Sequence, residues 1–323
     1  MDRRRFLLGS LSVLAVPVAD AGSQPAAKVH RIGFLRNGPP PRTFLEGFRQ
    51  GLREFGYVEG QNIVIEFALT ETSDQLVAAA AALVRRNVDV LLASGTPPVP
   101  VAKRATSTIP IVFVASIDPV ATGVVASLAR PGGNVTGFAG THADLMGKRI
   151  ELLRETVPKL ARVAIMAHAA NPGNVEYMRQ ADLAARAAGV TLQFLMVQDA
   201  GDFDRAFGAA RGAHALIQLD DVVFTSHRKQ VVELAMKHHL PAMYGFREFV
   251  DAGGLMAYGP DWPDLYRRAA GYIDRILKGT KPGALPVEQP TKFELVVNLN
   301  TAKTLGLTIP PSLLLRAEQV IDR

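Results

Sequence analysis

The amino-acid sequence predicts an α/β protein built from two doubly wound parallel-sheet lobes that are joined by a hinge. Short β-branched runs alternate with amphipathic helical stretches, a spacing typical of right-handed βαβ units. This alternation restarts near the middle of the 323-residue chain. Residues 22–323 are too many for one small core, whereas they suit two lobes of roughly 100–150 residues each.

The first half of the chain predicts five strands connected by helices. A helix is expected after the first strand because Phe44, Phe48 and Leu52 recur on one face at helical spacing. A second helix is expected over residues 73–86. The predicted strands lie at residues 31–35, 62–68, 88–93, 111–114 and 135–138. We expect these elements to form an N-terminal lobe over residues 30–140.

The second half repeats the pattern and then ends in a tail of different character. The predicted strands lie at residues 162–166, 191–197, 215–219 and 241–244, and the predicted helices at 145–157, 175–188, 203–210 and 228–238. A C-terminal lobe is therefore expected over residues 141–254. In the tail we expect strands at 255–258 and 293–298, a helix at 262–277, and a connection rich in Pro and Gly at 279–290. The tail, residues 255–323, is expected to cross between the lobes and to contribute to both.

The N-terminus has the features of an export signal. Arg3, Arg4 and Arg5 precede an apolar stretch that runs to Val18, and small residues mark a cleavage site near Ala21. The arginines followed by Phe and Leu resemble the twin-arginine type. The apolar stretch is shorter than the about 20 residues that span a bilayer, so no stable membrane insertion is expected. We predict a signal peptide at 1–21, a linker at 22–29 and a mature protein in the periplasm.

The composition argues against several classes of function. The net charge is +6, but the basic residues form no dense block interleaved with aromatics, so no nucleic-acid binding is expected. The chain has no cysteine, which excludes a thiol nucleophile, a thiolate metal site and a disulfide. The usual serine-nucleophile, phosphate-loop, dinucleotide and zinc motifs are absent, and the adjacent His238 and His239 point apart on a helix. We therefore expect no catalytic residue, no metal and no cofactor.

The candidate binding residues are those that follow each strand, because ligands of open parallel sheets bind beyond the carboxyl ends of the strands. In chain order they are Asn37, Gly95, Thr96, Ser116, Asp118, Asn171 and Asp220. Three of them, Thr96, Asp118 and Asn171, precede a proline, and such a residue can cap a helix whose N-terminus attracts a carboxylate. They serve either as ordinary caps or as parts of one shared cleft. Asp118 is ambiguous, because a carboxylate that caps its own helix is less free to meet a ligand amine.

Aromatic residues add to this set near the end of the second half. Tyr244 follows the last short strand and is expected to line the pocket. Phe246 and Phe249 are expected to be core residues of a helix. Tyr258 and Trp262 lie near the expected hinge, where an aromatic side chain either closes over a ligand or simply packs.

Four stretches of the chain together resemble a known family. They read FRQGLREFGYVEGQN from residue 48, ASLARPGGNVTG from residue 126, FREFV from residue 246 with GGL shortly after it, and LPVEQPTK from residue 285. They are similar to the ABC-transporter substrate-binding proteins of the tryptophan/tyrosine-binding type. The resemblance implies the type I periplasmic-binding-protein fold. It also implies an ABC permease and its ATPase as partners.

The resemblance further implies which loops form the binding site. They carry Gly95 and Thr96, residues 116–118, Thr141, Asn171, Asp220 and Tyr244. Many relatives have Gly or Ala at the position of Ile117. A bulky side chain at this position is expected to narrow or reshape the pocket.

These observations favour a monomeric periplasmic receptor that captures a small organic solute between its lobes and delivers it to a membrane permease. The expected solute carries a carboxylate and is amino-acid-like. The alternative is an enzyme on the same scaffold, such as a racemase-like one, and the absence of cysteine counts against its usual two-thiol version. A sugar-repressor-like regulator would need a DNA-binding helix-turn-helix ahead of the first strand, where the export signal stands.

Overall fold

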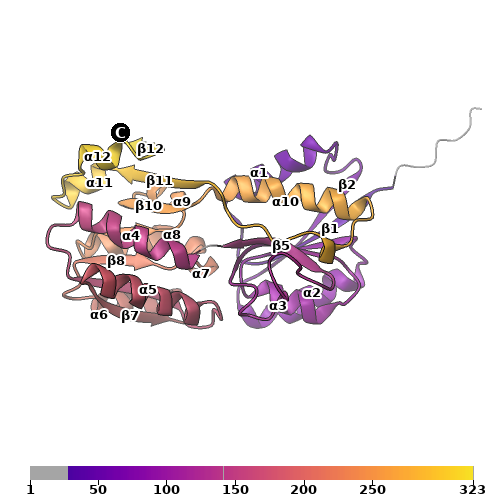
Figure 1. Ribbon diagram of the computed structural model, residues 1–323, viewed down its shortest axis with the longest axis horizontal. Helices are drawn as coiled ribbons and strands as arrows, with labels where there is room; N and C mark the ends of the chain where they lie inside the picture. Colours follow the sequence, from indigo (N-terminus) through magenta and orange to yellow (C-terminus); the bar gives the residue numbers. More distant parts are fainter. Residues whose placement is uncertain (1–27, 141, 323) are drawn as a thin grey trace, which may run out of the picture.

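The protein consists of two α/β lobes that lie side by side along the longest axis of the molecule (Figure 1). The structure is a computed structural model, and it describes residues 28–140 and 142–322, except for the side chains of residues 142–144. The predicted export signal and Thr141 therefore lie outside the described residues. In the described part of the chain, no helix combines the length and the apolar character needed to cross a membrane.

Lobe 1 contains a five-stranded parallel sheet in the order β2-β1-β3-β4-β5. Its central strands are buried along almost their whole length, because helices cover both faces of the sheet. Its strands are β1 (His30–Asn37), β2 (Ile63–Thr70), β3 (Val90–Ser94), β4 (Ile111–Ile117) and β5 (Val135–Gly140). Its helices from the first half of the chain are α1 (Arg42–Glu54), the short η1 (Ser73–Gln75), α2 (Leu76–Arg85) and α3 (Pro98–Ala105).

Lobe 1 also contains α10 (Trp262–Leu277), a helix encoded between two strands of the other lobe. This helix lies against α1 over one face of the lobe 1 sheet (Figure 1). The two backbones approach closely because α1 presents Gly47 and Gly51. A Cβ at either glycine would run into the backbone carbonyl oxygen of Pro263 or Arg267.

Lobe 2 contains a seven-stranded sheet in the order β12-β11-β10-β9-β8-β6-β7. All paired strands are parallel except β10 and β11, which are antiparallel. Its strands are β6 (Arg162–His168), β7 (Thr191–Val197), β8 (Ala215–Gln218), β9 (Ala242–Tyr244), β10 (Met256–Pro260), β11 (Phe293–Asn298) and β12 (Gln319–Ile321). Its helices are α4 (His142–Thr156), α5 (Asn174–Ala188), η2 (Ala200–Asp202), α6 (Phe203–Ala209), α7 (Val222–Ser226), α8 (Arg228–Lys237), α9 (Arg247–Asp251), α11 (Leu299–Thr304) and α12 (Pro311–Leu314).

Three chain segments connect the lobes. The first lies between the end of β5 at Gly140 and α4, the second joins β10 to α10 at residues 260–262, and the third runs from Glu288 to β11. Before the third crossing the chain passes through η3 (Pro282–Ala284), and Glu288 pairs with Phe138 of β5 in an isolated bridge. Three short connections of this kind allow one lobe to rotate against the other about a common hinge.

The predicted fold class is confirmed, since two lobes are each built around a parallel sheet with helices on both faces. One local expectation was wrong. Asp118 and Pro119 do not start a helix but enter a series of turns over residues 119–123. Asp118 has a φ of +35°, outside the helical region, and its carboxylate accepts the backbone N–H of Ala121 at 2.9 Å.

Candidate functional site

A small cavity lies where the carboxyl ends of the strands of both lobes meet. Four of the predicted residues line it together, Gly95 and Thr96 from lobe 1 and Asn171 and Asp220 from lobe 2. The cavity has a volume of about 30 Å³, little more than the room for one water molecule. The remaining lining residues are Arg36, Phe44, Pro97, Ala115, Asp221, Val222, Phe246 and Trp262.

Direct contacts between the lobes explain why this central cavity is so small. The hydroxyl of Thr43 on α1 donates to Glu248 Oε1 on α9 at 2.5 Å. Ile117 at the end of β4 lies against Gly173, just ahead of α5. The lobes must therefore separate before a molecule of amino-acid size can enter.

The lobe 1 side of the cavity is built on a distorted end of β4. The register between β4 and β5 shifts between Val114 and Ser116, and Ala115 has a φ of +66°. Such bulges and strained residues occur most often next to functional sites, where they redirect side chains. Ser116 is fully buried and its hydroxyl has no hydrogen-bond partner in the described part of the chain.

Thr96 has a different role from the cap that its sequence suggests. Its hydroxyl accepts the backbone N–H of Ile117 at 3.0 Å, so it bridges the ends of β3 and β4 instead of capping α3. Asn171 does not cap a helix either, because the N-cap of α5 is Gly173; its side-chain oxygen accepts the N–H of Gly173 at 2.9 Å and closes the turn ahead of the helix.

On the lobe 2 side, Asp220 is engaged by a buried arginine of α4. Arg149 is fully buried, and its Nη2 lies 3.0 and 3.3 Å from the two carboxylate oxygens of Asp220. The Arg149 Nε donates to the carbonyl of Tyr258 at 2.9 Å, and the hydroxyl of Tyr177 donates to Asp220 Oδ2 at 3.4 Å. Burial raises the pKa of Tyr177 well above its usual value, and the Asp220 charge adds to that shift.

The carboxylate of the neighbouring Asp221 also accepts hydrogen bonds. It accepts the side-chain N–H of Asn171 at 2.7 Å and the backbone N–H of Val223 at 2.9 Å. Its other neighbour is His168, whose Nδ1 lies 3.2 Å from Asp221 Oδ1. Burial alone would lower the pKa of His168, but the hydrogen bond and charge of Asp221 hold it above the usual value.

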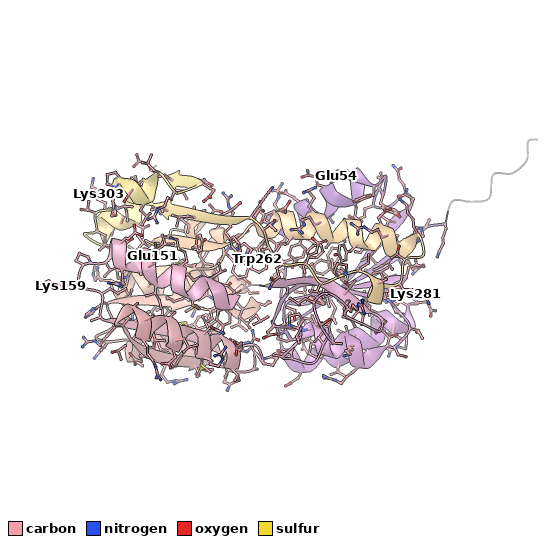
Figure 2. All side chains as sticks on the ribbon, viewed as in Figure 1. Glu54, Glu151, Lys159, Trp262, Lys281 and Lys303 are labelled. Carbon is pink, nitrogen blue, oxygen red and sulfur yellow. The ribbon has the colours of Figure 1, made fainter. Side chains whose placement is uncertain are left out.

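Aromatic rings form the remaining wall of the cavity. Phe44 of lobe 1 packs against Phe246 of lobe 2, with ring centroids 5.9 Å apart, and against Trp262, at 6.3 Å. Figure 2 shows Trp262 at the junction of the two lobes. The Trp262 Nε1–H donates to the carbonyl of Gly245 at 3.2 Å.

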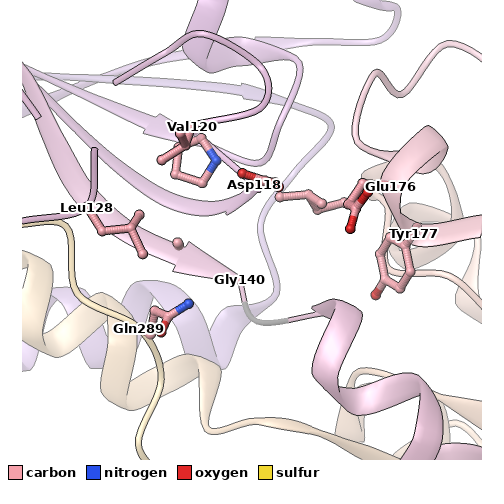
Figure 3. A pocket seen from close by; sticks show the side chains of 10 residues that line it. Asp118, Val120, Leu128, Gly140, Glu176, Tyr177 and Gln289 are labelled. Atoms are coloured by element: carbon pink, nitrogen blue, oxygen red, sulfur yellow. The ribbon is translucent and has the colours of Figure 1, made fainter. Parts of the chain in front are cut away.

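Four of the predicted site residues that the structure describes do not line the central cavity: Ser116, which lies buried beside it, and Asn37, Tyr244 and Asp118. Asn37 lines a neighbouring cavity of about 280 Å³ and pairs with Thr70 and Ser73. Tyr244 is buried in lobe 2, where its ring stacks on Phe249 with centroids 4.6 Å apart. Asp118 lines a third cavity, which Figure 3 shows.

That third cavity lies beside the first crossing segment and has a volume of about 160 Å³. Asp118 of lobe 1 faces Glu176 of α5 across it, and Gln289 of the third crossing points into it (Figure 3). Hydrogen bonds from Arg179 and Gln180 lower the pKa of Glu176 to about 2. Among the described residues, no group of three or more His, Asp or Glu side chains could hold a metal ion.

Several residues of the central cavity were not predicted as ligand contacts, and Arg36 is the most important of them. Arg36, Asn37 and Gly38 all follow the first predicted strand, but only Asn37 was predicted as a contact. Phe44 and Phe246 were expected to be core residues, and they are buried, but they also line the cavity. The signal that could have found Arg36 is a cationic side chain at the carboxyl end of a buried strand.

Comparisons with known proteins agree on one family. A family model described as ABC transporter substrate binding protein matches residues 36–321. A tyrosine-binding protein of Clostridioides difficile (strain R20291) is 25% identical over 264 residues, which cover 81% of this chain and 76% of that protein.

Solved structures are similar over almost the whole chain. A structure described as the ABC domain in complex with L-Trp, from Streptococcus pneumoniae, superimposes with a TM-score of 0.85 at 26% identity, covering 91% of this chain and all of that one. A conserved domain protein from Vibrio cholerae gives the same TM-score and coverage at 27% identity. The two-lobed fold is that of type I periplasmic binding proteins.

Proposed function

Because this chain belongs to the family of ABC transporter substrate-binding proteins, we propose that it is the periplasmic solute receptor of an ABC importer. It captures a small organic solute between its lobes and delivers that solute to a membrane permease, whose ATPase drives uptake. The solute bears a carboxylate and is amino-acid-like. Two relatives support that ligand class, one named as tyrosine-binding and one solved with L-Trp.

The observation that carries the proposal is the convergence of strand ends from both lobes on one cavity. Gly95 and Thr96 come from lobe 1, and Asn171 and Asp220 from lobe 2. A ligand placed there touches both lobes at once, so that binding favours their closure. We propose these four residues and Ser116, whose buried hydroxyl is unpaired, as ligand contacts.

A ligand screen on the mature protein tests the proposal. Amino acids, small carboxylates and purine-like solutes are added in a thermal-shift assay, and Trp262, the single tryptophan of the chain, reports closure by its fluorescence. A true ligand at a hundredfold excess over its Kd stabilises the folded protein by about 2.7 kcal/mol. It also makes the protein more compact in solution scattering. A bound ligand that leaves the scattering profile unchanged would contradict capture by lobe closure.

A second experiment tests the location. Arg3, Arg4 and Arg5 support export by the twin-arginine route, after which cleavage near Ala21 releases a mature, monomeric protein into the periplasm. Replacing all three arginines by lysine should leave the precursor in the cytoplasm, as judged by cell fractionation. All three are changed because Arg4 and Arg5 could substitute for Arg3 and Arg4. Normal periplasmic accumulation of this variant would exclude that route.

A further inference from the structure

Arg36 is a buried cation in the interlobe site, and among the described residues no carboxylate forms an ion pair with it. The residue is 3% exposed and lines the central cavity. In the described part of the chain its one side-chain hydrogen bond runs from Nη1 to the neutral Ser94 Oγ at 2.7 Å, and its Nε has no partner. The Ser94 hydroxyl is in turn hydrogen-bonded to the hydroxyl of Tyr266, which is fully buried on α10.

A buried guanidinium group in this position would be stabilised by an anionic ligand. Leaving an ion unpaired in the protein interior is costly. The planar array of N–H donors of the guanidinium matches the two oxygens of a carboxylate. The Ser94 hydroxyl accepts one N–H of the guanidinium and is itself held by the Tyr266 hydroxyl, so the group is fixed at one end while the residue lines the cavity between the lobes.

The carboxylates that line the other side of the cavity are poorly suited to bind a ligand ammonium group, because each already has partners. Asp220 is the lining carboxylate that could meet a ligand ammonium group, but both of its oxygens lie within 3.3 Å of Arg149 Nη2. Asp221 accepts hydrogen bonds from Asn171 and from a backbone N–H. An ammonium group that approaches a carboxylate already paired in this way gains little further stabilisation.

We propose that Arg36 is the anion-binding residue of this site, and that the protein recognises its solute by the carboxylate and not by an amine. The inference rests on the proposed solute-binding function and narrows its ligand class. The ligands are carboxylic acids for which an α-amino group is optional. The carboxylate is held from lobe 1 by Arg36, which is at the end of β1.

The first test uses acetate as a minimal anionic probe, so that it does not depend on knowing the solute. The melting temperature of the mature protein is compared in sodium acetate and in neutral acetamide with sodium chloride, at matched ionic strength. Acetate should stabilise the wild type more than acetamide does. The difference should vanish in Arg36→Gln, persist in Arg36→Lys, and persist in Arg53→Gln, a control on the exposed side of α1.

The second test compares solutes in matched sets of three: an amino acid, its amide and its desamino acid. Suitable sets are phenylalanine, phenylalaninamide and hydrocinnamate, or leucine, leucinamide and isocaproate, with Trp262 fluorescence as the signal. The wild type should bind the acid about 10- to 100-fold more tightly than the amide, as expected for hydrogen bonds to a charged group. The acid and its desamino analogue should differ by less than about fivefold. In Arg36→Gln the preference for the acid over the amide should disappear.

Each outcome has a defined meaning. An Arg36-dependent effect of acetate without closure by any solute of the panel supports the anion site and contradicts the proposed amino-acid-like solute. Tight binding of amides and acids alike, unchanged in Arg36→Gln, overturns the inference and leaves the proposed function intact. No Arg36-dependent preference for an anion in either test also overturns it. A loss of 100-fold or more on removing the amine would show that an ammonium contact dominates, against the inference.

Discussion

Gly173 offers a way to hinder closure of the lobes without disturbing either lobe. It lies just ahead of α5 with a φ of −71° and a ψ of −14°, a conformation that alanine adopts freely. A Cβ at this position would lie 2.7 Å from Ile117 Cβ and 2.9 Å from Ile117 Cγ2, both across the interface in lobe 1. Gly173→Ala therefore introduces a clash only when the lobes are closed.

The size of the effect follows from these distances. Carbon atoms in favourable contact are about 3.5–4.0 Å apart, so the lobes must move apart by about 1 Å. Overpacking of this kind costs about 1–3 kcal/mol. Because the closed form carries the cost, ligand affinity should fall about 5- to 150-fold. The stability of the unliganded protein should be unchanged or rise by up to about 1 kcal/mol, since alanine restricts the unfolded chain.

The assay is ligand titration by Trp262 fluorescence, combined with solution scattering of the saturated protein. Gly208→Ala is the matched control, because Gly208 lies in α6 and its added Cβ would have no neighbour within 4 Å. In an Ile117→Gly background the clashing atoms are gone, so adding Gly173→Ala should cost no affinity. If Gly173→Ala binds as tightly as Gly208→Ala and compacts equally, the contact is not made in the liganded form and the reasoning fails.

Three further predictions concern stability. Because Asp221 holds the pKa of His168 above 6.5, that group stabilises the fold fully below pH 6.5, and its contribution is lost as the pH rises through the raised pKa. In urea unfolding across this pH range, the free energy of unfolding should fall more for the wild type than for His168→Gln. An equal dependence on pH in the two proteins would contradict the assignment. Thr96→Ala leaves the buried N–H of Ile117 unpaired and should cost about 1–3 kcal/mol in the same assay, so an unchanged midpoint would refute that role. Arg149→Met removes the cation that pairs with the buried Asp220 carboxylate and should cost about 3–5 kcal/mol, part of which Asp220→Asn should restore; no recovery would argue against the pair.

The sequence predicted the fold well where local signals are strong. The helix at residues 262–277 and the strand at 293–298 have the bounds that the sequence predicts, because the helix begins after a capping Asp261 and ends before Gly279. The short elements at the C-terminus, α11, α12 and β12, were not predicted. They are only three to six residues long, too short for periodicity to identify.

The site was harder to predict because its members depend on partners that lie many positions away in the sequence. Asp220 and Thr96 could be placed at strand ends, but nothing local indicates that Arg149 pairs with one or that Ile117 donates to the other. Arg36 resembles an ordinary solvated arginine at the end of a strand. Its burial and its hydrogen bond to Ser94 arise from packing in the folded lobe, at separations in sequence that no pattern records.

The position of α10 in lobe 1 affects the order of folding during translation and the choice of boundaries for expressing a single lobe. During synthesis the ribosome releases all of residues 30–140 long before it makes Trp262, so the part of the lobe 1 sheet that α10 covers stays exposed while lobe 2 emerges. The first lobe to be translated is therefore not the first that can finish folding. Expressing it alone would require residues 262–287 to be spliced back onto it, whereas a simple truncation after residue 140 would leave Phe34, Phe44 and Phe48 open to aggregation.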